Sequence, residues 1–158
     1  MYIFTLKDRS SLKARIRFGV LMRVAGAGLH YKSSSDPGIG DLIVISVANV
    51  GRRPVTVTGA GVGFYQNPIV GFRSAKLQSG FTHGLEQLPK KLEENDPEIV
   101  LWTLKSDLLA DIRDGLSKHP DLFKGDELPD HFWVSSSGKR HWRGLPNKFR
   151  RWFKENLV

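Results

Sequence analysis

The 158-residue chain contains no cysteine. Disulfide bonds, thiol nucleophiles, iron–sulfur clusters and thiolate zinc sites are therefore excluded. An apolar run of the ~20 residues that a membrane-spanning helix needs is also missing. Arg23 interrupts the apolar segment 18–30, which does not fit a secretory signal either. We therefore expect a cytoplasmic protein with no membrane partner.

The sequence lacks the glycine motifs of nucleotide-binding proteins. Gly59, Gly61 and Gly63 alternate, whereas the dinucleotide fingerprint is G-x-G-x-x-G between a strand and a helix. No helical pattern follows these glycines, and the chain has no Gly-Lys-Ser/Thr loop. We interpret the glycines as positions on one strand face that leave room for a neighbouring ring or backbone.

Recognisable metal and catalytic patterns are missing as well. The five histidines show no i, i+4 pair, no H-E-x-x-H and no H-x-H spacing, so no metal site is expected. Asp130, His131 and the serines at 135–137 are the residue types of a hydrolase triad, but there is no G-x-S-x-G motif. We also expect that the adjacent Asp130 and His131 cannot orient each other as a triad requires. The sequence predicts a protein that is not an enzyme and has no cofactor.

The composition is that of an ordinary globular protein, with 40% hydrophobic and 25% charged residues. The length fits one domain. We predict a single domain over residues 1–158, with a basic hairpin and helix at 139–158.

Two β-branched segments give the clearest strand signals. Residues 41–50 are apolar on both faces, which is typical of a central strand, and residues 54–65 follow after a short turn. In that turn, Asn49 can bond to the backbone two residues on, Gly51 allows a positive φ and Pro54 can open a strand. We expect the two segments to pair as a tight strand–turn–strand unit.

Weaker patterns predict the remaining elements. We expect strands over 14–31, 69–77 and 98–104, a polar connection over 88–97, a helix over 106–117, a hairpin over 131–145 and a last helix over 147–156. The fold class is then mainly β: an immunoglobulin-like antiparallel β-sandwich with one or two short helices. An α+β domain with a mixed sheet is the alternative.

Residues 41–64 combine an apolar strand, an Asn-x-Gly-Arg-Arg-Pro turn and a Val/Thr strand, and Ser136 to Lys139 read Ser-Ser-Gly-Lys. In these features the chain resembles uncharacterised bacterial proteins with an immunoglobulin-like β-sandwich. The resemblance covers residues 41–64 and 130–146, about a quarter of the chain. It implies the fold and carries no catalytic residues.

The net charge of +8 is unevenly distributed. Residues 1–32 carry seven cationic side chains against Asp8, and residues 139–158 carry seven against Glu155, so each end has a net charge of +6 and the middle has −4. Such an asymmetry points to a polyanion, an acidic protein surface or an anionic membrane as partner.

The C-terminal segment combines these charges with aromatic residues. In the last helix Phe149, Trp152, Phe153 and Leu157 form an apolar stripe. We predict a non-catalytic accessory module that binds another protein, or a second copy as a homodimer. The alternative is a nucleic-acid-binding module, because nucleic-acid grooves also mix basic and aromatic residues. If the apolar stripe instead packs on the protein's own sheet and the basic face is only solvated surface, the sequence supports neither a protein-binding nor a nucleic-acid-binding module. The candidate partner-binding residues are Lys139, Arg140, Arg143, Lys148, Arg150, Arg151, Trp152 and Lys154.

Overall fold

The computed structural model describes residues 11–24, 28–34, 42–64, 78–80, 88–118, 128–136 and 139–157, of which 20–24, 28–34 and 78–80 are described by their backbone. The strand expected over 69–77 lies outside these residues. The described elements are β1 (Leu12–Val24), β2 (Gly28–Ser34), β3 (Leu42–Asn49), β4 (Val55–Gly63), β5 (Gln78–Gly80), β6 (Lys90–Leu92), β7 (Ile99–Leu104), α2 (Lys105–Lys118), β8 (His131–Ser136), β9 (Lys139–Gly144) and α3 (Asn147–Leu157).

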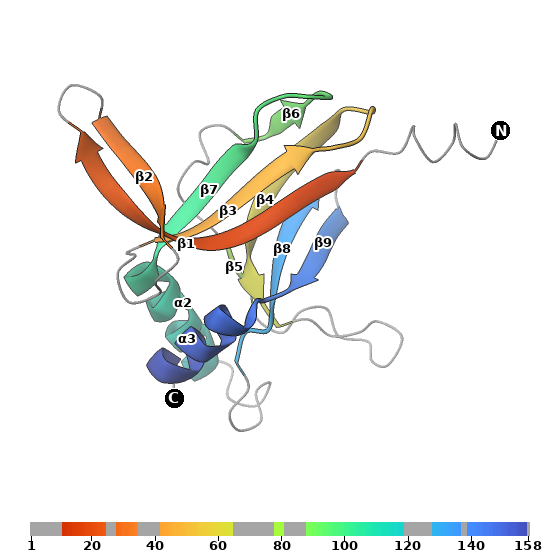
Figure 1. Ribbon diagram of the computed structural model, residues 1–158. Coiled ribbons are helices and arrows are strands. Elements are labelled where there is room, and N and C mark those ends of the chain that lie inside the picture. The colour runs from red at the N-terminus through yellow and green to blue at the C-terminus, as the bar shows by residue number, and fades with distance from the viewer. Residues whose placement is uncertain are drawn as a thin grey trace.

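The strands form two antiparallel sheets (Figure 1). The first sheet has the order β2-β1-β3-β7. The second has the order β5-β4-β8-β9, with β6 also paired to β4. Every strand pair between described residues is antiparallel, as predicted, so the alternative of a mixed sheet is wrong for this part of the chain. The protein is mainly β, in an arrangement compatible with a sandwich.

The strand β3 is central in the first sheet, between β1 and β7. Ile43, Ile45 and Val47 alternate along it and belong to the core, as the period of two in a strand requires. Val44 and Ser46 on its other face are buried too. The prediction that this strand is buried on both faces is confirmed.

The predicted pairing of segments 41–50 and 54–65 is wrong. Both edges of β3 are occupied by β1 and β7, and those of β4 by β8 on one side and β5 and β6 on the other. The turn at residues 50–54 therefore crosses from one sheet to the other. This crossing lets the apolar inner faces of β3 and β4 pack across a common core, whereas a hairpin would have placed them side by side in one sheet.

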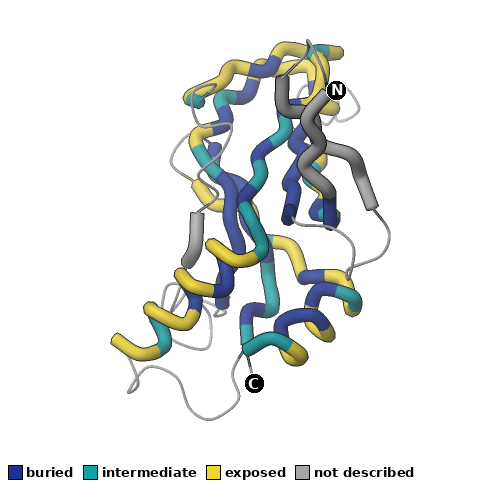
Figure 2. Tube along the Cα trace, turned by 90° about the vertical axis from the view of Figure 1, so that its left-hand side faces the viewer, coloured by how far each residue is buried: buried dark blue, intermediate teal, exposed yellow. Residues whose placement is uncertain are grey.

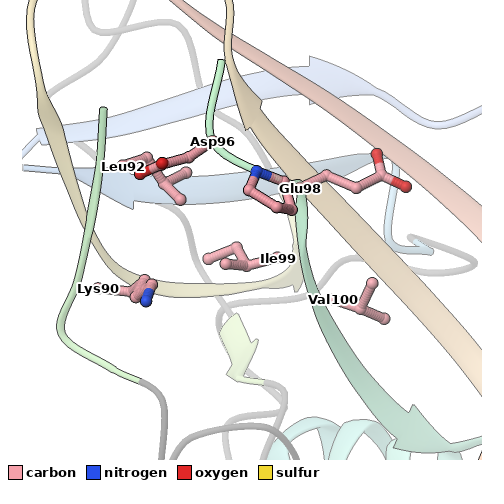
Figure 3. Close-up of a pocket in the computed structure, with 7 residues that line it drawn as sticks. Lys90, Leu92, Asp96, Glu98, Ile99 and Val100 are labelled. Carbon is pink, nitrogen blue, oxygen red and sulfur yellow. The ribbon is translucent and has the colours of Figure 1, made fainter. Parts of the chain in front are cut away.

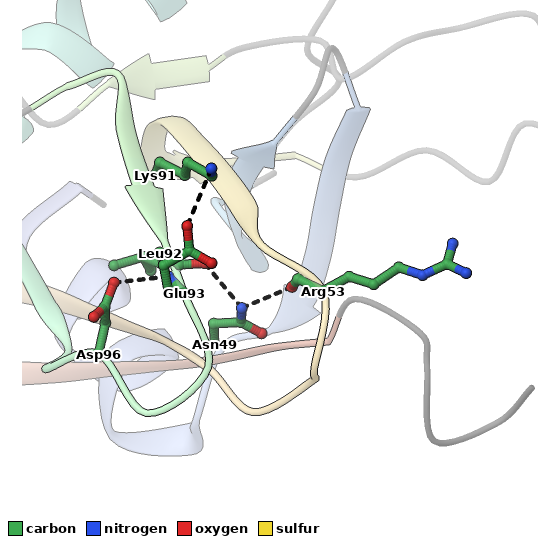
Figure 4. A network of polar contacts seen from close by, with 6 residues as sticks. All are labelled: Asn49, Arg53, Lys91, Leu92, Glu93 and Asp96. Atoms are coloured by element: carbon green, nitrogen blue, oxygen red, sulfur yellow. Dashed lines mark hydrogen bonds and ion pairs between the residues drawn. The ribbon is translucent and has the colours of Figure 1, made fainter. Parts of the chain in front are cut away.

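The side chain of Asn49 holds this crossing turn (Figure 4). Its Oδ1 accepts a hydrogen bond from the Gly51 backbone N–H at 2.9 Å, as expected for an Asn at this position. Its Nδ2 donates to the carbonyl oxygens of Arg53 at 2.8 Å and Leu92 at 2.9 Å. One buried amide thus ties β3 to the turn and to β6.

Two other predictions need correction. The single strand expected over 14–31 is a hairpin, in which Val24 of β1 pairs with Gly28 of β2. Alternation with a period of two continues through a hairpin, so it does not show where the chain reverses. The connection expected over 88–97 contains the short strand β6, in which Leu92 pairs with Val55 and is buried.

Both helices have the positions that the apolar spacing predicted, 106–117 and 147–156, extended by one or two residues. They lie together at one end of the two sheets (Figure 1). Each helix buries one side and exposes the other (Figure 2). A single core cluster joins residues of both sheets and both helices. No described helix is long and apolar enough to cross a membrane.

Candidate functional site

The eight candidate residues lie on β9 and α3. Within the described residues, β9 is an edge strand that pairs with β8 alone. Lys139, Arg140 and Arg143 are exposed along it. The loop at Leu145 and Pro146 leads directly into α3, where both Phe149 and Arg150 donate a backbone hydrogen bond to the Pro146 carbonyl oxygen. The strand and the helix therefore follow one another without a flexible linker.

Trp152 does not lie on this surface. Its side chain is 7% exposed and belongs to the core. Its ring meets the edge of Phe18 with centroids 5.8 Å apart and that of Phe153 at 4.9 Å. The apolar stripe of the helix needs burial and finds it against β1, so we remove Trp152 from the candidate contact surface.

The cationic side chains of α3 differ in their exposure and in their contacts. Arg151 and Lys154 are exposed. Lys148 is half-buried, and its Nζ lies 5.8 Å from the Phe18 ring and 5.7 Å from the Phe149 ring. Arg150 donates from Nε to the Leu145 carbonyl oxygen at 3.2 Å, and its guanidinium lies beside Gly144. Arg150 therefore continues the basic residues of β9 onto the helix.

We call the seven remaining candidates the basic strip: Lys139, Arg140, Arg143, Lys148, Arg150, Arg151 and Lys154. None of them forms an ion pair with a carboxylate in the described part of the chain. Cations elsewhere do: Lys118 lies 2.8 Å from Asp114 and Lys91 lies 3.1 Å from Glu93. Within the described residues, no carboxylate therefore neutralises the charge of the basic strip.

Two tryptophans lie next to the basic strip. Neither is among the partner-binding residues that the sequence predicted. Phe132 and Val134 of β8 point into the core, so Trp133 points to the other face of the second sheet. Trp133 is paired across the strands with Trp142 of β9. The Arg140 guanidinium lies over the Trp133 ring, 4.5 Å from its centroid. Alternation along residues 131–136 could have identified Trp133 as a residue of the outer face.

His131 completes this group. It lies on the same face as Trp133, and its ring meets that of Trp142 edge-on with centroids 6.5 Å apart. We call the group of His131, Trp133, Arg140 and Trp142 the tryptophan face. It occupies the outer side of β8 and β9, where it joins the basic strip through Arg140.

Gly59 of β4 makes room for this face. A β-bulge between Val57 and Gly59 turns Gly59 away from the core. A Cβ on Gly59 would lie 3.5 Å from the Trp133 ring and 3.1 Å from Ser135 Oγ. The close contact at Gly59 is therefore with the Ser135 hydroxyl, whereas the Trp133 ring lies at an ordinary contact distance, so the interpretation of the alternating glycines as space for a ring stays a prediction.

Among the described residues, the residue types of a hydrolase triad are not assembled in one place. His131 Nδ1 lies 3.0 Å from Asp130 Oδ1, and the expectation that these neighbours cannot orient each other as a triad requires stays a prediction. The serine contact, however, belongs to another histidine: Ser136 Oγ lies 2.8 Å from His141 Nε2. His131 and Ser136 are at opposite ends of β8, about 17 Å apart at the rise of an extended strand. The aspartate and the serine thus contact different histidines.

A cavity of about 480 Å³ lies between the edges of the two sheets. Lys90 and Leu92 of β6 and Ile99 and Val100 of β7 lie on opposite sides of it (Figure 3). Glu98 also lines it, but its carboxylate points away toward β1 (Figure 3), where it lies 3.8 Å from Arg17. Among the described residues, no cluster of histidine and carboxylate side chains could hold a metal ion.

No protein-family model, no curated protein and no solved structure matches this chain. The interpretation of the site therefore rests on its geometry and charge.

Proposed function

We propose that this protein is a non-catalytic, cytoplasmic module that binds nucleic acid along β9 and α3. The observation that carries the proposal is the basic strip, seven cations without a carboxylate partner among the described residues. Of these, Arg140 lies on the tryptophan face and Arg150 lies beside Gly144 at its edge. Phosphates would supply the missing counter-charges, and their contacts dominate the affinity of most nucleic-acid-binding proteins. The tryptophan face supplies the aromatic surface that basic grooves for nucleic acids contain.

The same surface offers little to an apolar protein partner. The centres of stable protein interfaces are depleted in charged residues other than arginine and are rich in aromatic side chains. Among the described residues the only large hydrophobic side chain that is exposed is Val50, which lies in the turn between the sheets. The aromatic stripe of α3 is buried in the protein's own core. These features favour nucleic acid over the protein partner or homodimer that the sequence first suggested.

The salt dependence of binding tests this proposal. Binding of a fluorescently labelled oligonucleotide is measured by anisotropy over a range of salt concentrations. We expect the logarithm of the affinity to fall with the logarithm of the salt concentration, by about 0.7 per phosphate contact for a single strand. Replacing Lys139, Arg140 and Arg143 by Gln should lower the magnitude of this slope by about 2.

A matched control removes the same charge elsewhere. Lys90, Lys91 and Lys118 are exposed, and replacing them by Gln also removes three positive charges. This variant should bind nearly as well as the unmodified protein. If both triple variants lose affinity equally, the net charge and not the basic strip is responsible. If no oligonucleotide binds at low salt, the proposal is wrong, and sedimentation velocity then tests the homodimer.

We also propose that the two sheets form an immunoglobulin-like sandwich. Lettered along the chain, β1, β3 and β7 correspond to strands A, B and E, and β4, β8 and β9 to strands C, F and G. The observed neighbours, β1-β3-β7 and β4-β8-β9, then follow the A-B-E and C-F-G orders of that fold. Strands B and C of that fold lie in different sheets, as β3 and β4 do. A crystal structure in which β1, β3 and β7, or β4, β8 and β9, have other neighbours would contradict the assignment.

A further inference from the structure

We infer that Arg140 holds one backbone phosphate of the nucleic acid, that the Trp133 ring positions Arg140 for this contact, and that the contact is independent of the base sequence. The inference rests on the proposed function and names the group that the same site recognises. The free oxygens of a phosphate match the parallel N–H donors of a guanidinium. Contacts to phosphate carry no sequence information.

The Trp133 side chain is fixed on the outer face of the second sheet. It is only 7% exposed. Its ring extends from β8 over β4, where its Cζ3 and Cη2 atoms lie 3.5 Å and 3.7 Å from the position of a Cβ on Gly59. Arg140 approaches from β9, on the other side of β8, as a diagonal neighbour of Trp133. The two side chains together therefore span the strands β4, β8 and β9.

The ring contact holds Arg140 without using a hydrogen-bond acceptor. The Arg140 guanidinium lies 4.5 Å from the centroid of the Trp133 ring, which attracts its charge. Among the described residues, no oxygen accepts a hydrogen bond from this guanidinium. Two other arginines of the basic strip do donate to the chain itself: Arg143 to the Trp142 carbonyl oxygen at 3.3 Å and Arg150 to that of Leu145 at 3.2 Å. Arg140 is thus positioned while its N–H donors remain for a ligand.

The described neighbours of Arg140 across the sheet are uncharged. Ser135 lies directly opposite Arg140 on β8. The Ser135 hydroxyl lies 2.8 Å from the Thr58 hydroxyl and donates to the Gly59 carbonyl oxygen at 3.3 Å. These hydroxyls are held by each other and by the backbone. No carboxylate in this part of the described chain therefore competes with a phosphate for Arg140.

An arginine that is positioned before binding loses less conformational freedom when a phosphate arrives. Arg151 provides the contrast, because it is an exposed cation of α3 with no ring or hydrogen-bond contact in the part of the chain that the structure describes. Both arginines attract a phosphate by their charge. Immobilising a long side chain weakens binding, and this cost is smaller for Arg140 because the Trp133 ring already restrains it.

Charge-preserving substitutions test the phosphate contact. Anisotropy is measured with labelled oligo(dT), with oligo(dA) and with an abasic strand of the same length. Arg140→Lys keeps the charge but removes the guanidinium, and we expect it to weaken binding by about two- to tenfold, the factor for immobilising one long side chain. The loss should be the same for all three strands, because they share phosphates and differ in bases. The matched control Arg151→Lys should leave the affinity nearly unchanged.

The salt dependence distinguishes a lost charge from a lost geometry. Arg140→Lys should leave the slope of log affinity against log salt concentration unchanged, because the number of cations is the same. Arg140→Gln should lower the magnitude of this slope by about 0.7, the value for one phosphate contact of a single strand.

Trp133→Leu tests the positioning role, because leucine is apolar but has no ring. It should weaken binding by a factor similar to that of Arg140→Lys, again with an unchanged salt slope. In the double variant the two losses should not add, because Trp133 acts through Arg140. Circular dichroism checks that each variant is folded. If Trp133→Leu does not fold, Trp133→Phe takes its place in the same cycle with a smaller loss, because a phenyl ring attracts a cation less strongly than an indole.

The outcomes separate this inference from the proposed function. An Arg140→Lys variant that binds as well as Arg151→Lys would overturn the phosphate contact and leave the proposed function standing. A loss that differs between the three strands would also overturn it, because Arg140 would then contact a base. Additive losses in the double variant would overturn the positioning role of Trp133. Failure of the unmodified protein to bind any strand at low salt would instead contradict the proposed function itself.

Discussion

The ring of Phe18 stacks on the ring of Phe149, with centroids 4.1 Å apart and planes 16° from parallel. Both side chains are fully buried. Phe18 belongs to β1, in the basic N-terminal part of the sequence, and Phe149 to α3, in the basic C-terminal part. This contact therefore joins β1 to α3, two elements that the acidic middle of the sequence separates along the chain.

This stacked pair predicts a coupled loss of stability. Phe149→Ala should lower the free energy of unfolding by about 3–5 kcal/mol, because it removes a buried ring and leaves a cavity. Phe18→Ala should cost a similar amount. The double variant should lose less than the two single losses together, because the rings contact each other. Denaturation in urea measures all three, and additive losses would contradict the pairing.

Substitution of Trp152 distinguishes a role in stability from a role in binding. Trp152→Ala should lower the free energy of unfolding by about 3–5 kcal/mol, as for other large buried aromatic residues. At a temperature where the variant remains folded, its affinity for oligo(dT) should be unchanged. Lys154→Gln should do the reverse and weaken binding with little effect on stability. A folded Trp152→Ala variant with weakened binding would return Trp152 to the contact surface.

Asn49 anchors the crossing between the sheets. Asn49→Ala removes three hydrogen bonds and leaves the Gly51 N–H and the Arg53 and Leu92 carbonyl groups without that partner. The expected loss is about 2–4 kcal/mol, from about 1 kcal/mol for each bond. Thermal or urea denaturation measures it. Arg52→Ala changes an exposed residue of the same turn and should stay within about 0.5 kcal/mol of the unmodified protein.

Gly59 tests the space beneath the tryptophan face. Gly59→Ala places a Cβ 3.1 Å from Ser135 Oγ, which a small shift can relieve. Gly59→Val adds branches toward the Trp133 ring, so it should displace the indole and lower stability more than the alanine variant does. Near-ultraviolet circular dichroism follows the ring. A valine variant as stable as the alanine variant, with an unaltered spectrum, would show that the ring has other space.

Lys118 provides a test in alkaline solution. The hydrogen bond and the charge of Asp114 raise the pKa of Lys118. The pair contributes to stability below the ordinary lysine pKa, and the contribution is lost as the pH rises through the raised value. Asp114→Asn should lower the pKa of Lys118 in an NMR titration. Because the pair is exposed, its removal should hardly change stability at neutral pH.

The sequence by itself determined most of the local structure. The apolar spacing of Leu108, Leu109 and Ile112 placed α2, and Pro146 with the stripe of Phe149 and Trp152 placed α3. Local signals suffice there because a helix or strand is selected by the spacing of apolar residues within one segment. The same reasoning predicted that β3 is buried on both faces and that Asn49 bonds to its own turn.

Only the tertiary structure decided how these segments meet. An Asn-x-Gly-Arg-Arg-Pro turn between β-branched runs has the same appearance whether it closes a hairpin or crosses between sheets. The choice depends on β1 and β7, which occupy the edges of β3 and come from other parts of the chain. In the same way, the sequence showed that Trp152 belongs to an apolar stripe. It did not show which part of the protein would cover that stripe. Packing against Phe18 buried Trp152 and left Trp133 and Trp142, on the opposite face of the second sheet from the core, beside the cations. Contacts between distant segments depend on the summed packing of the whole core, which no local pattern records.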